Sequence, residues 1–232
     1  MGVREPTRRV VAAHADSHAW LGFARRRGDI VISTPPKSGT TWMQGIVASI
    51  LWADGDIAGI PFELSPWLDV RRPPESDTLS DLAAQEHRRF ITTHSPADAI
   101  PIDDECCYVT VHRDLRDVTM SWANHRREMR AELIELFNEL AADDDVTPLA
   151  PVWDGDMDEL VDEMRAASQH AEVFGSAFEN GADGFFHRGV NRRWQGVLTD
   201  TQLERLAEMT AALPSDAAEW LEHGSLALGW RP

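Results

Sequence analysis

The sequence predicts an α/β fold in which helices flank a central, mostly parallel sheet. Three short apolar runs, rich in the β-branched and aromatic side chains of strands, occur at residues 30–32, 90–92 and 106–111. Stretches with a helical pattern, such as residues 42–52, lie between and after these runs. Because strands that alternate with helices form parallel sheets, this order favours an α/β domain, and 232 residues are enough for its core. We therefore expect a single domain over residues 1–232.

Composition and charge argue against several classes of protein. The net charge is -17, from 39 acidic and 22 basic residues, whereas nucleic-acid binding requires a basic face. The sequence has no run of about 18 apolar residues and no apolar core near its N-terminus, which predicts a cytoplasmic protein without a membrane span. Cys106 and Cys107 are adjacent, which favours two small buried apolar residues over a disulfide or a metal pair. A homo-oligomer is compatible with all of these features.

The first strand leads into a turn that is typical of anion sites. Pro35 and Pro36 end the strand, and small residues form a compact turn before the proline-free apolar run 42–52, which predicts a buried helix. A helix that begins after such a turn points free backbone N–H groups and the positive end of its dipole at an anion. Lys37, in this turn, is the only lysine among the 22 basic residues. These features predict a phosphate-type site, although an ordinary turn with an exposed lysine shares the pattern.

A P-loop kinase or nucleotidase is a second alternative for this turn. Its pattern, G-x-x-x-x-G-K-[ST], places lysine directly after the second glycine, and its chemistry needs Mg²⁺. Here Lys37 comes two residues before Gly39, the only glycine of the turn, so the P-loop pattern is not met.

The same turn carries a resemblance to a known family. It reads Thr34-Pro35-Pro36-Lys37-Ser38-Gly39-Thr40-Thr41-Trp42 and resembles the 5′-phosphosulfate loop of the cytosolic-type sulfotransferases, which use 3′-phosphoadenosine 5′-phosphosulfate (PAPS) as donor and release PAP. The resemblance implies a P-loop-like three-layer fold and a reaction without a metal ion. It also implies that Lys37 stabilises the leaving oxygen and that Trp42 lies near adenine. The implied donor-loop residues are Lys37, Ser38, Gly39, Thr40, Thr41 and Trp42.

A second motif follows the second predicted strand. Residues 92–96 (TTHSP), followed by Ile100 and Pro101, resemble the family pattern K-T-H-x-P. The resemblance implies that His94 is the general base that takes the proton of the acceptor. Thr92 stands where the family has lysine, which leaves one positive group fewer at the site.

Two further motifs resemble the 3′-phosphate site of the family. Residues 113–121 (RDLRDVTMS) match every fixed position of R-[ND]-x-R-D-x-x-x-S, and residues 185–194 (FFHRGVNRRW) resemble F-x-R-K-G-x-x-G-x-W, with His187 in place of arginine. An arginine suits phosphate because its planar fork binds two oxygens at once. We expect Arg116 and Asp117 to form a local ion pair instead. The implied 3′-phosphate residues are Arg113, Ser121, His187, Arg188 and Gly189.

The acceptor cannot be named from the sequence, because acceptor pockets are loops and apolar walls without a residue code. The proline-rich segment after the first helix occupies a position that lines the acceptor pocket in the family, so Phe62, Trp67 and Leu68 are candidates beside His94. The family's further strand between the last two motifs is missing here, since residues 131–185 contain no matching run. The resemblance implies transfer of a sulfuryl group from PAPS to a hydroxyl of a small apolar or amphiphilic acceptor. The alternative is a PAPS- or PAP-binding protein with impaired catalysis.

Overall fold

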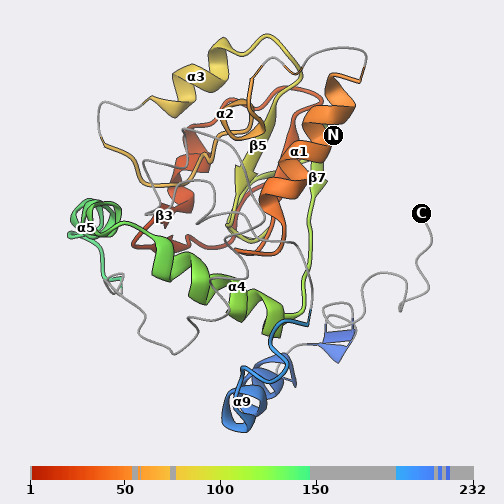
Figure 1. Ribbon diagram of the computed structural model, residues 1–232. Coiled ribbons are helices and arrows are strands. Elements are labelled where there is room, and N and C mark those ends of the chain that lie inside the picture. The colour runs from red at the N-terminus through yellow and green to blue at the C-terminus, as the bar shows by residue number, and fades with distance from the viewer. Residues whose placement is uncertain are drawn as a thin grey trace. The chain divides into compact units, whose positions relative to one another are not determined.

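The computed structural model describes residues 2–53, 57, 59–73, 77–146, 192–211, 214, 215, 218 and 219 (Figure 1). The chain forms two compact units: Met1–Val111 with Phe137–Leu149, and His112–Leu136 with Ala150–Pro232. Three predicted site residues, His187, Arg188 and Gly189, lie outside the described residues. So does most of the stretch in which we predicted no further strand.

The first unit is built on a three-stranded parallel sheet in the order β5-β4-β7 (Figure 1). Its strands are β4 (Ile30–Ser33), β5 (Phe90–Thr93) and β7 (Cys107–Val109). Ile30 lies opposite both Phe90 and Cys107, so the strands begin level and their carboxyl ends meet at one edge. The three predicted strands and their parallel arrangement are confirmed. Open α/β sheets bind ligands at this carboxyl edge.

Each face of the sheet carries its own core, because successive side chains of a strand point to opposite faces. On one face, Phe90 packs with Val47 of helix α1 (Thr40–Leu51). On the other face, Val31 and Ile91 pack with apolar residues from outside the sheet. These residues are Trp20, Phe23, Leu68, Leu82 and Ile100. The sheet is therefore the middle of three layers within this unit.

Short elements surround the sheet. They are β1 (Val3–Arg4) paired antiparallel with β6 (Ile102–Asp103), β2 (Val11–Ala12) paired antiparallel with β3 (Ala15–Asp16), the 3₁₀ helix η1 (Ser17–Gly22), α2 (Pro61–Leu64) and α3 (Thr78–Ala84). A buried ion pair lies at the amino ends of β4 and β5. In it, Arg89 Nη2 is 2.5 Å from Asp29 Oδ2, and both side chains are 2% exposed.

Two predictions about burial are wrong. Helix α1 is not buried all round, because a sheet contacts only one side of a helix. The four-residue spacing of Trp42, Ile46 and Ile50 places them together on another side, where they are 70%, 47% and 68% exposed. Cys106 is partly exposed and Cys107 is exposed, because they lie at the start of β7, which is an edge strand of the described sheet.

The second unit contains α4 (Leu115–Glu128) and α9 (Asp200–Ala211), and α5 (Ala131–Leu140) contributes residues to both units. Met120 of α4 packs into a small apolar cluster. Its other members are Ala123, Trp194, Val197 and Leu198.

Among the residues that the structure describes, no helix has the length and apolar character needed to cross a membrane.

Candidate active site

The turn between β4 and α1 has the backbone of an anion-binding loop. Lys37 has a φ of 64° and Gly39 a φ of 122°, and positive φ values are uncommon outside glycine. The two residues allow the chain to leave β4 and enter α1 within a short loop. Gly39 is the N-cap residue of α1 and no side chain caps this end. The first N–H groups of the helix therefore face the space in front of it, where an anion would bind.

The hydroxyl groups of this loop are not all available to a ligand. Thr34 and Thr40 are both buried, and their Oγ1 atoms share a hydrogen bond of 2.6 Å. This bond ties the two ends of the loop together and engages the Thr40 hydroxyl that we predicted for the donor. Ser38 is also buried, and its backbone N–H donates to the carbonyl of Pro35 at 3.2 Å. Thr40 would contribute its backbone N–H to an anion site, and its hydroxyl could donate as well if Thr34 is the donor of the shared hydrogen bond.

His94 directly follows β5 and is held from two sides. Its Nδ1 atom lies 2.7 Å from the backbone oxygen of Thr34. Its ring meets the ring of Trp67 edge to face, with the centroids 4.1 Å apart. A carbonyl oxygen only accepts hydrogen bonds, so Nδ1 carries the proton of the neutral imidazole. Nε2 then keeps its lone pair, which is the form that a general base requires.

The surroundings of His94 also keep the ring uncharged. Burial lowers its pKa from 6.5 to about 4, and the hydrogen bond to Thr34 opposes this shift. Electrostatic interactions with His14 and Lys37 lower the pKa further, so Lys37 lies within electrostatic range of the ring. At neutral pH the imidazole is therefore uncharged and keeps a lone pair on Nε2.

Thr92, which replaces the lysine of the family motif, has a structural role. Its side chain is fully buried. Its Oγ1 accepts a hydrogen bond from Gln44 Nε2 at 3.0 Å and shares one with Ser65 Oγ at 2.8 Å. Gln44 also donates to the backbone oxygen of Ser65 at 3.0 Å. A lysine at position 92 would have to bury its charge in this network, which joins α1, β5 and residue 65.

The predicted acceptor residues have different surroundings. Trp67 contacts the ring of His94, whereas Leu68 is 4% exposed and packs in the core with Val31. Phe62 lies in α2. The structure therefore brings Trp67 to His94 and places Leu68 in the core.

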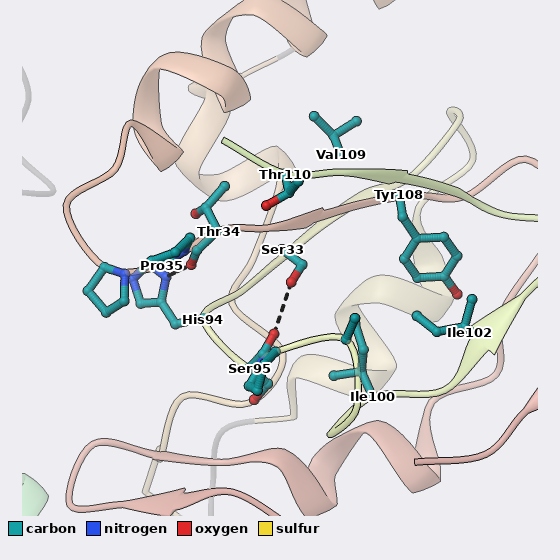
Figure 2. Close-up of a pocket in the computed structure, with 13 residues that line it drawn as sticks. Ser33, Thr34, Pro35, His94, Ser95, Ile100, Ile102, Tyr108, Val109 and Thr110 are labelled. Atoms are coloured by element: carbon teal, nitrogen blue, oxygen red, sulfur yellow. Dashed lines mark hydrogen bonds between the residues drawn. The ribbon is translucent and has the colours of Figure 1, made fainter. Parts of the chain in front are cut away.

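A pocket of about 500 Å³ opens beside His94 at the carboxyl edge of the sheet (Figure 2). This volume is in the range of small-molecule sites. Figure 2 shows His94 at one end of the pocket and Tyr108, Ile100 and Ile102 at the other. Of the described residues that line the pocket, none is acidic or basic apart from the uncharged His94.

Hydrogen bonds engage several polar groups around this pocket. The Tyr108 hydroxyl donates to the carbonyl of Pro101 at 3.0 Å and accepts from the backbone N–H of Asp103 at 2.9 Å. Ser33 Oγ donates to the carbonyl of Ser95 at 2.9 Å, as the dashed line in Figure 2 marks. The hydroxyl of Tyr108 is therefore fully engaged, and the tyrosine end of the pocket is apolar.

In the second unit, the predicted ion pair between Arg116 and Asp117 is wrong. Neighbouring residues of a helix do not face each other. Arg116 pairs with Asp114, with 2.5 Å between Arg116 Nη2 and Asp114 Oδ2, and the same carboxylate caps α4 by accepting the Arg116 N–H at 2.8 Å. The Arg116 guanidinium also lies over the ring of Trp194, 4.4 Å from its centroid.

Asp117 instead joins the two predicted 3′-phosphate motifs. Its buried carboxylate accepts the backbone N–H of Arg192 at 2.9 Å and that of Arg193 at 3.1 Å. Burial lowers the pKa of Arg193, and the charge of Arg113 lowers it further, so these two guanidinium groups lie within electrostatic range of each other. The carboxylate of Asp117 opposes this lowering, and a bound anion would stabilise the like-charged pair further. Ser121 is 5% exposed on the same helix as Asp117.

Comparison with known proteins decides the family. The model of the sulfotransferase domain family matches residues 27–184, which is more than half of the chain. The chain belongs to the sulfotransferase domain family. The match includes the predicted donor loop and His94. It continues through the stretch in which we predicted that the family's further strand is missing, and it ends just before residues 185–194.

Curated sulfotransferases match a shorter part of the chain. A glycolipid sulfotransferase from Mycobacterium tuberculosis is 38% identical over 125 residues, which are 54% of this chain and 38% of that protein. Human sulfotransferase 1E1 is 31% identical over 107 residues, 43% of this chain and 36% of that protein. This chain therefore matches well under half of the length of either relative.

A solved structure supports the fold of this chain. Mouse sulfotransferase SULT7A1, complexed with PAP, is similar with a TM-score of 0.55 over 90% of this chain and 93% of that chain, at 17% identity. The likeness and the parallel sheet between helices confirm a P-loop-like α/β fold.

Sequence reasoning missed several residues of this site. Ile102 and Tyr108 reach the pocket from β6 and β7, and no local pattern connects them with His94. A signal for Tyr108 was the alternation of side chains along β7, which places Tyr108 and Thr110 on the same face of the strand. Gln44 had a clearer signal, because it is a polar residue inside an apolar helix.

Proposed function

We propose that this protein moves a sulfuryl group from PAPS to a hydroxyl of a small apolar or amphiphilic acceptor. The state of His94 carries the proposal: its imidazole is neutral, its Nε2 is unprotonated, and it lies within electrostatic range of Lys37. Sulfuryl transfer needs a base for the acceptor and a cation for the leaving group. Membership of the sulfotransferase family, and a glycolipid sulfotransferase among the relatives, support this reaction.

The reaction would combine these two residues with the start of α1. His94 Nε2 takes the proton of the acceptor hydroxyl while the hydroxyl oxygen bonds to sulfur. The bond between sulfur and the bridging oxygen of the 5′-phosphate breaks, and this oxygen keeps the electron pair and leaves with PAP. Lys37 and the N–H groups of Gly39 to Thr41 stabilise the charge on that oxygen. The scheme relies on placement and charge stabilisation and does not use a metal ion.

The donor residues are proposed as the sequence predicts them. In the first unit the loop residues bind the 5′-phosphosulfate, and Trp42, which is 70% exposed, has a free ring face on which adenine would stack. In the second unit the like-charged pair of Arg113 and Arg193 supports a 3′-phosphate site. The sequence predicts Arg113, Ser121, His187, Arg188 and Gly189 for the 3′-phosphate, and we add Arg193 to this set.

The pocket beside His94 supports an uncharged acceptor. A hydroxyl at the His94 end would place the body of the acceptor against Ile100, Ile102 and Tyr108. A charged group there would lose its hydration without gaining a partner. We therefore propose that neutral acceptors with an apolar body are preferred, and that Trp67 borders the reactive hydroxyl.

The test is transfer of radiolabel from PAPS to a panel of phenols, sterols and glycolipids, with and without a chelator. Transfer that persists with the chelator supports the proposal. Use of ATP with Mg²⁺, without transfer of label from PAPS, would contradict it and indicate a kinase instead.

A second candidate is a PAPS- or PAP-binding protein with impaired turnover. Thr92 favours it, because the family's lysine is absent and its position is used for a buried hydrogen-bond network. Calorimetric binding of PAP without label transfer to any acceptor in the panel would support this candidate.

A further inference from the structure

Asp69 is a buried carboxylate that the proposed reaction does not use. Its side chain belongs to a residue that is 3% exposed, and burial raises its pKa. Its Oδ2 accepts a hydrogen bond from Ser95 Oγ at 2.5 Å and another from Thr93 Oγ1. A buried carboxylate is costly unless its partners compensate for lost hydration. The Trp20 indole and the Asp69 backbone N–H also favour the charged form, yet burial outweighs all of these partners, so the position of Asp69 calls for a further explanation.

The two partners of Asp69 are the residues on either side of His94. They are also joined to each other, because the backbone N–H of Ser95 donates to Thr93 Oγ1 at 2.8 Å. Asp69, Thr93 and Ser95 thus form a closed hydrogen-bonded ring that spans the backbone of His94. This ring fixes the direction in which the side chain of His94 leaves the end of β5.

Asp69 is itself held in place by the sheet. The segment that leads to it runs beside β5, with the N–H of Thr92 donating to Pro66 O at 3.1 Å and the N–H of Leu68 donating to Thr92 O at 3.3 Å. The carbonyl of Asp69 accepts the N–H of Asp16 at 2.8 Å. Trp67, two residues before Asp69 in this segment, contacts the ring of His94. One segment therefore holds both the ring of His94 and its neighbours.

We propose that Asp69 is a positioning residue for His94, which it orients by holding Thr93 and Ser95. The expected loss of turnover in an Asp69 variant rests on the proposed function. The expected change in the pKa of His94 does not. The ring owes its low pKa chiefly to burial, and His14 and Lys37 are the charged or titratable groups that lower it further. Loosening residues 93–95 would let water reach the ring, so its pKa is a direct measure of its position.

The experiment is an NMR titration of ring-labelled histidine in the full chain, with the His94 signal assigned from His94→Gln. Asp69→Ala should raise the pKa of His94 from about 4 toward 6.5. It should also lower kcat by roughly ten- to a hundredfold while the Kd for PAP changes little, since small misplacements of a reacting group have effects of that size. Asp69→Asn keeps an oxygen acceptor and should restore both values. Ser95→Ala removes one of the two bonds and should give a smaller rise.

Asp29→Asn is the matched control, because it alters another buried aspartate at the opposite ends of β4 and β5. It should lower the melting temperature and leave the His94 pKa unchanged. An unchanged His94 pKa in folded Asp69→Ala overturns the proposal. If Asp69→Ala does not fold, an unchanged His94 pKa in Ser95→Ala overturns the proposal instead. Absence of label transfer by the wild type, together with the expected pKa rise, would reject the proposed function and keep the positioning role.

Discussion

The donor loop and the acceptor pocket meet at His94, but the two regions are built in different ways. The loop consists of consecutive residues, 34–42, and works through its backbone conformation and one lysine. The pocket draws Ser33, Ile102 and Tyr108 from three separate strands, β4, β6 and β7. On the proposed function, a local motif would set the donor chemistry, whereas the packing of distant segments would set the choice of acceptor. Substitutions in the two regions should therefore change different kinetic constants.

His94 belongs to both regions, and its loss should have the largest effect. His94→Ala should lower kcat by roughly 10²–10⁴-fold, the usual contribution of a general base, and leave the Kd for PAP nearly unchanged. His18→Ala, at an exposed histidine of η1, is the control and should behave like the wild type. Steady-state kinetics and calorimetry check both values. A His94→Ala variant that turns over normally but no longer binds PAP would assign His94 to the donor side alone.

Lys37 tests the donor side by itself. Lys37→Ala should lower kcat by roughly 10²-fold or more, as removal of one electrostatic stabiliser does, with little change in the KM for the acceptor. Lys37→Arg should restore only part of the rate, because a planar fork does not replace a compact ammonium group. Arg8→Ala, which removes an exposed cation paired with Asp98, serves as the control. Turnover near that of the wild type in Lys37→Ala would remove this lysine from the mechanism.

Recognition of the 3′-phosphate should have a smaller effect on binding, and it should depend on side chains outside the donor loop. PAP should bind about ten- to a hundredfold more tightly than ADP, because charge-assisted hydrogen bonds contribute about 1.5–3 kcal/mol. Arg113→Ala should remove most of this preference. Calorimetric titration of both nucleotides into both proteins measures it. Equal affinity for PAP and ADP in the wild type would be incompatible with a 3′-phosphate site.

The smallest expected effect concerns the apolar end of the pocket. Ile102→Ala should raise the KM for the acceptor by about five- to thirtyfold, since it removes roughly 1–2 kcal/mol of apolar contact. The Kd for PAP should not change. The control is Ile50→Ala, because Ile50 is 68% exposed on α1 and outside the pocket. A change in PAP binding with an unaltered acceptor KM would reverse the assignment of the two regions.

The same contrast explains what the sequence could predict. The strands and the loop were predictable because their signals are local: β-branched runs, a double proline and a single lysine among arginines. The pocket was not predictable, because Ile102 and Tyr108 become neighbours of His94 only when β6 and β7 are in place. The tertiary role of Asp69 was hidden for the same reason, since its partners are 24 and 26 residues away.

Two wrong predictions have different causes. The exposure of Trp42 on α1 could not be read from a run that is apolar on every side, because only the position of the sheet selects the buried side. The expected pair of Arg116 and Asp117 ignored helix geometry, in which adjacent residues point apart. Asp114, at the N-cap of α4, was the available partner of Arg116.

The pH dependence of kcat/KM tests the central claim most directly, namely that His94 is a neutral base with a strongly lowered pKa. A base is active only when unprotonated, so the rate falls as pH drops through its pKa. With a pKa of about 4, kcat/KM should stay level from about pH 8 down to about pH 5.5, and the acidic limb should appear only below that. Circular dichroism at each pH verifies that the protein remains folded. An ordinary histidine of pKa 6.5 would lose about tenfold in rate by about pH 5.5, and a decline of that size in folded protein would contradict the account.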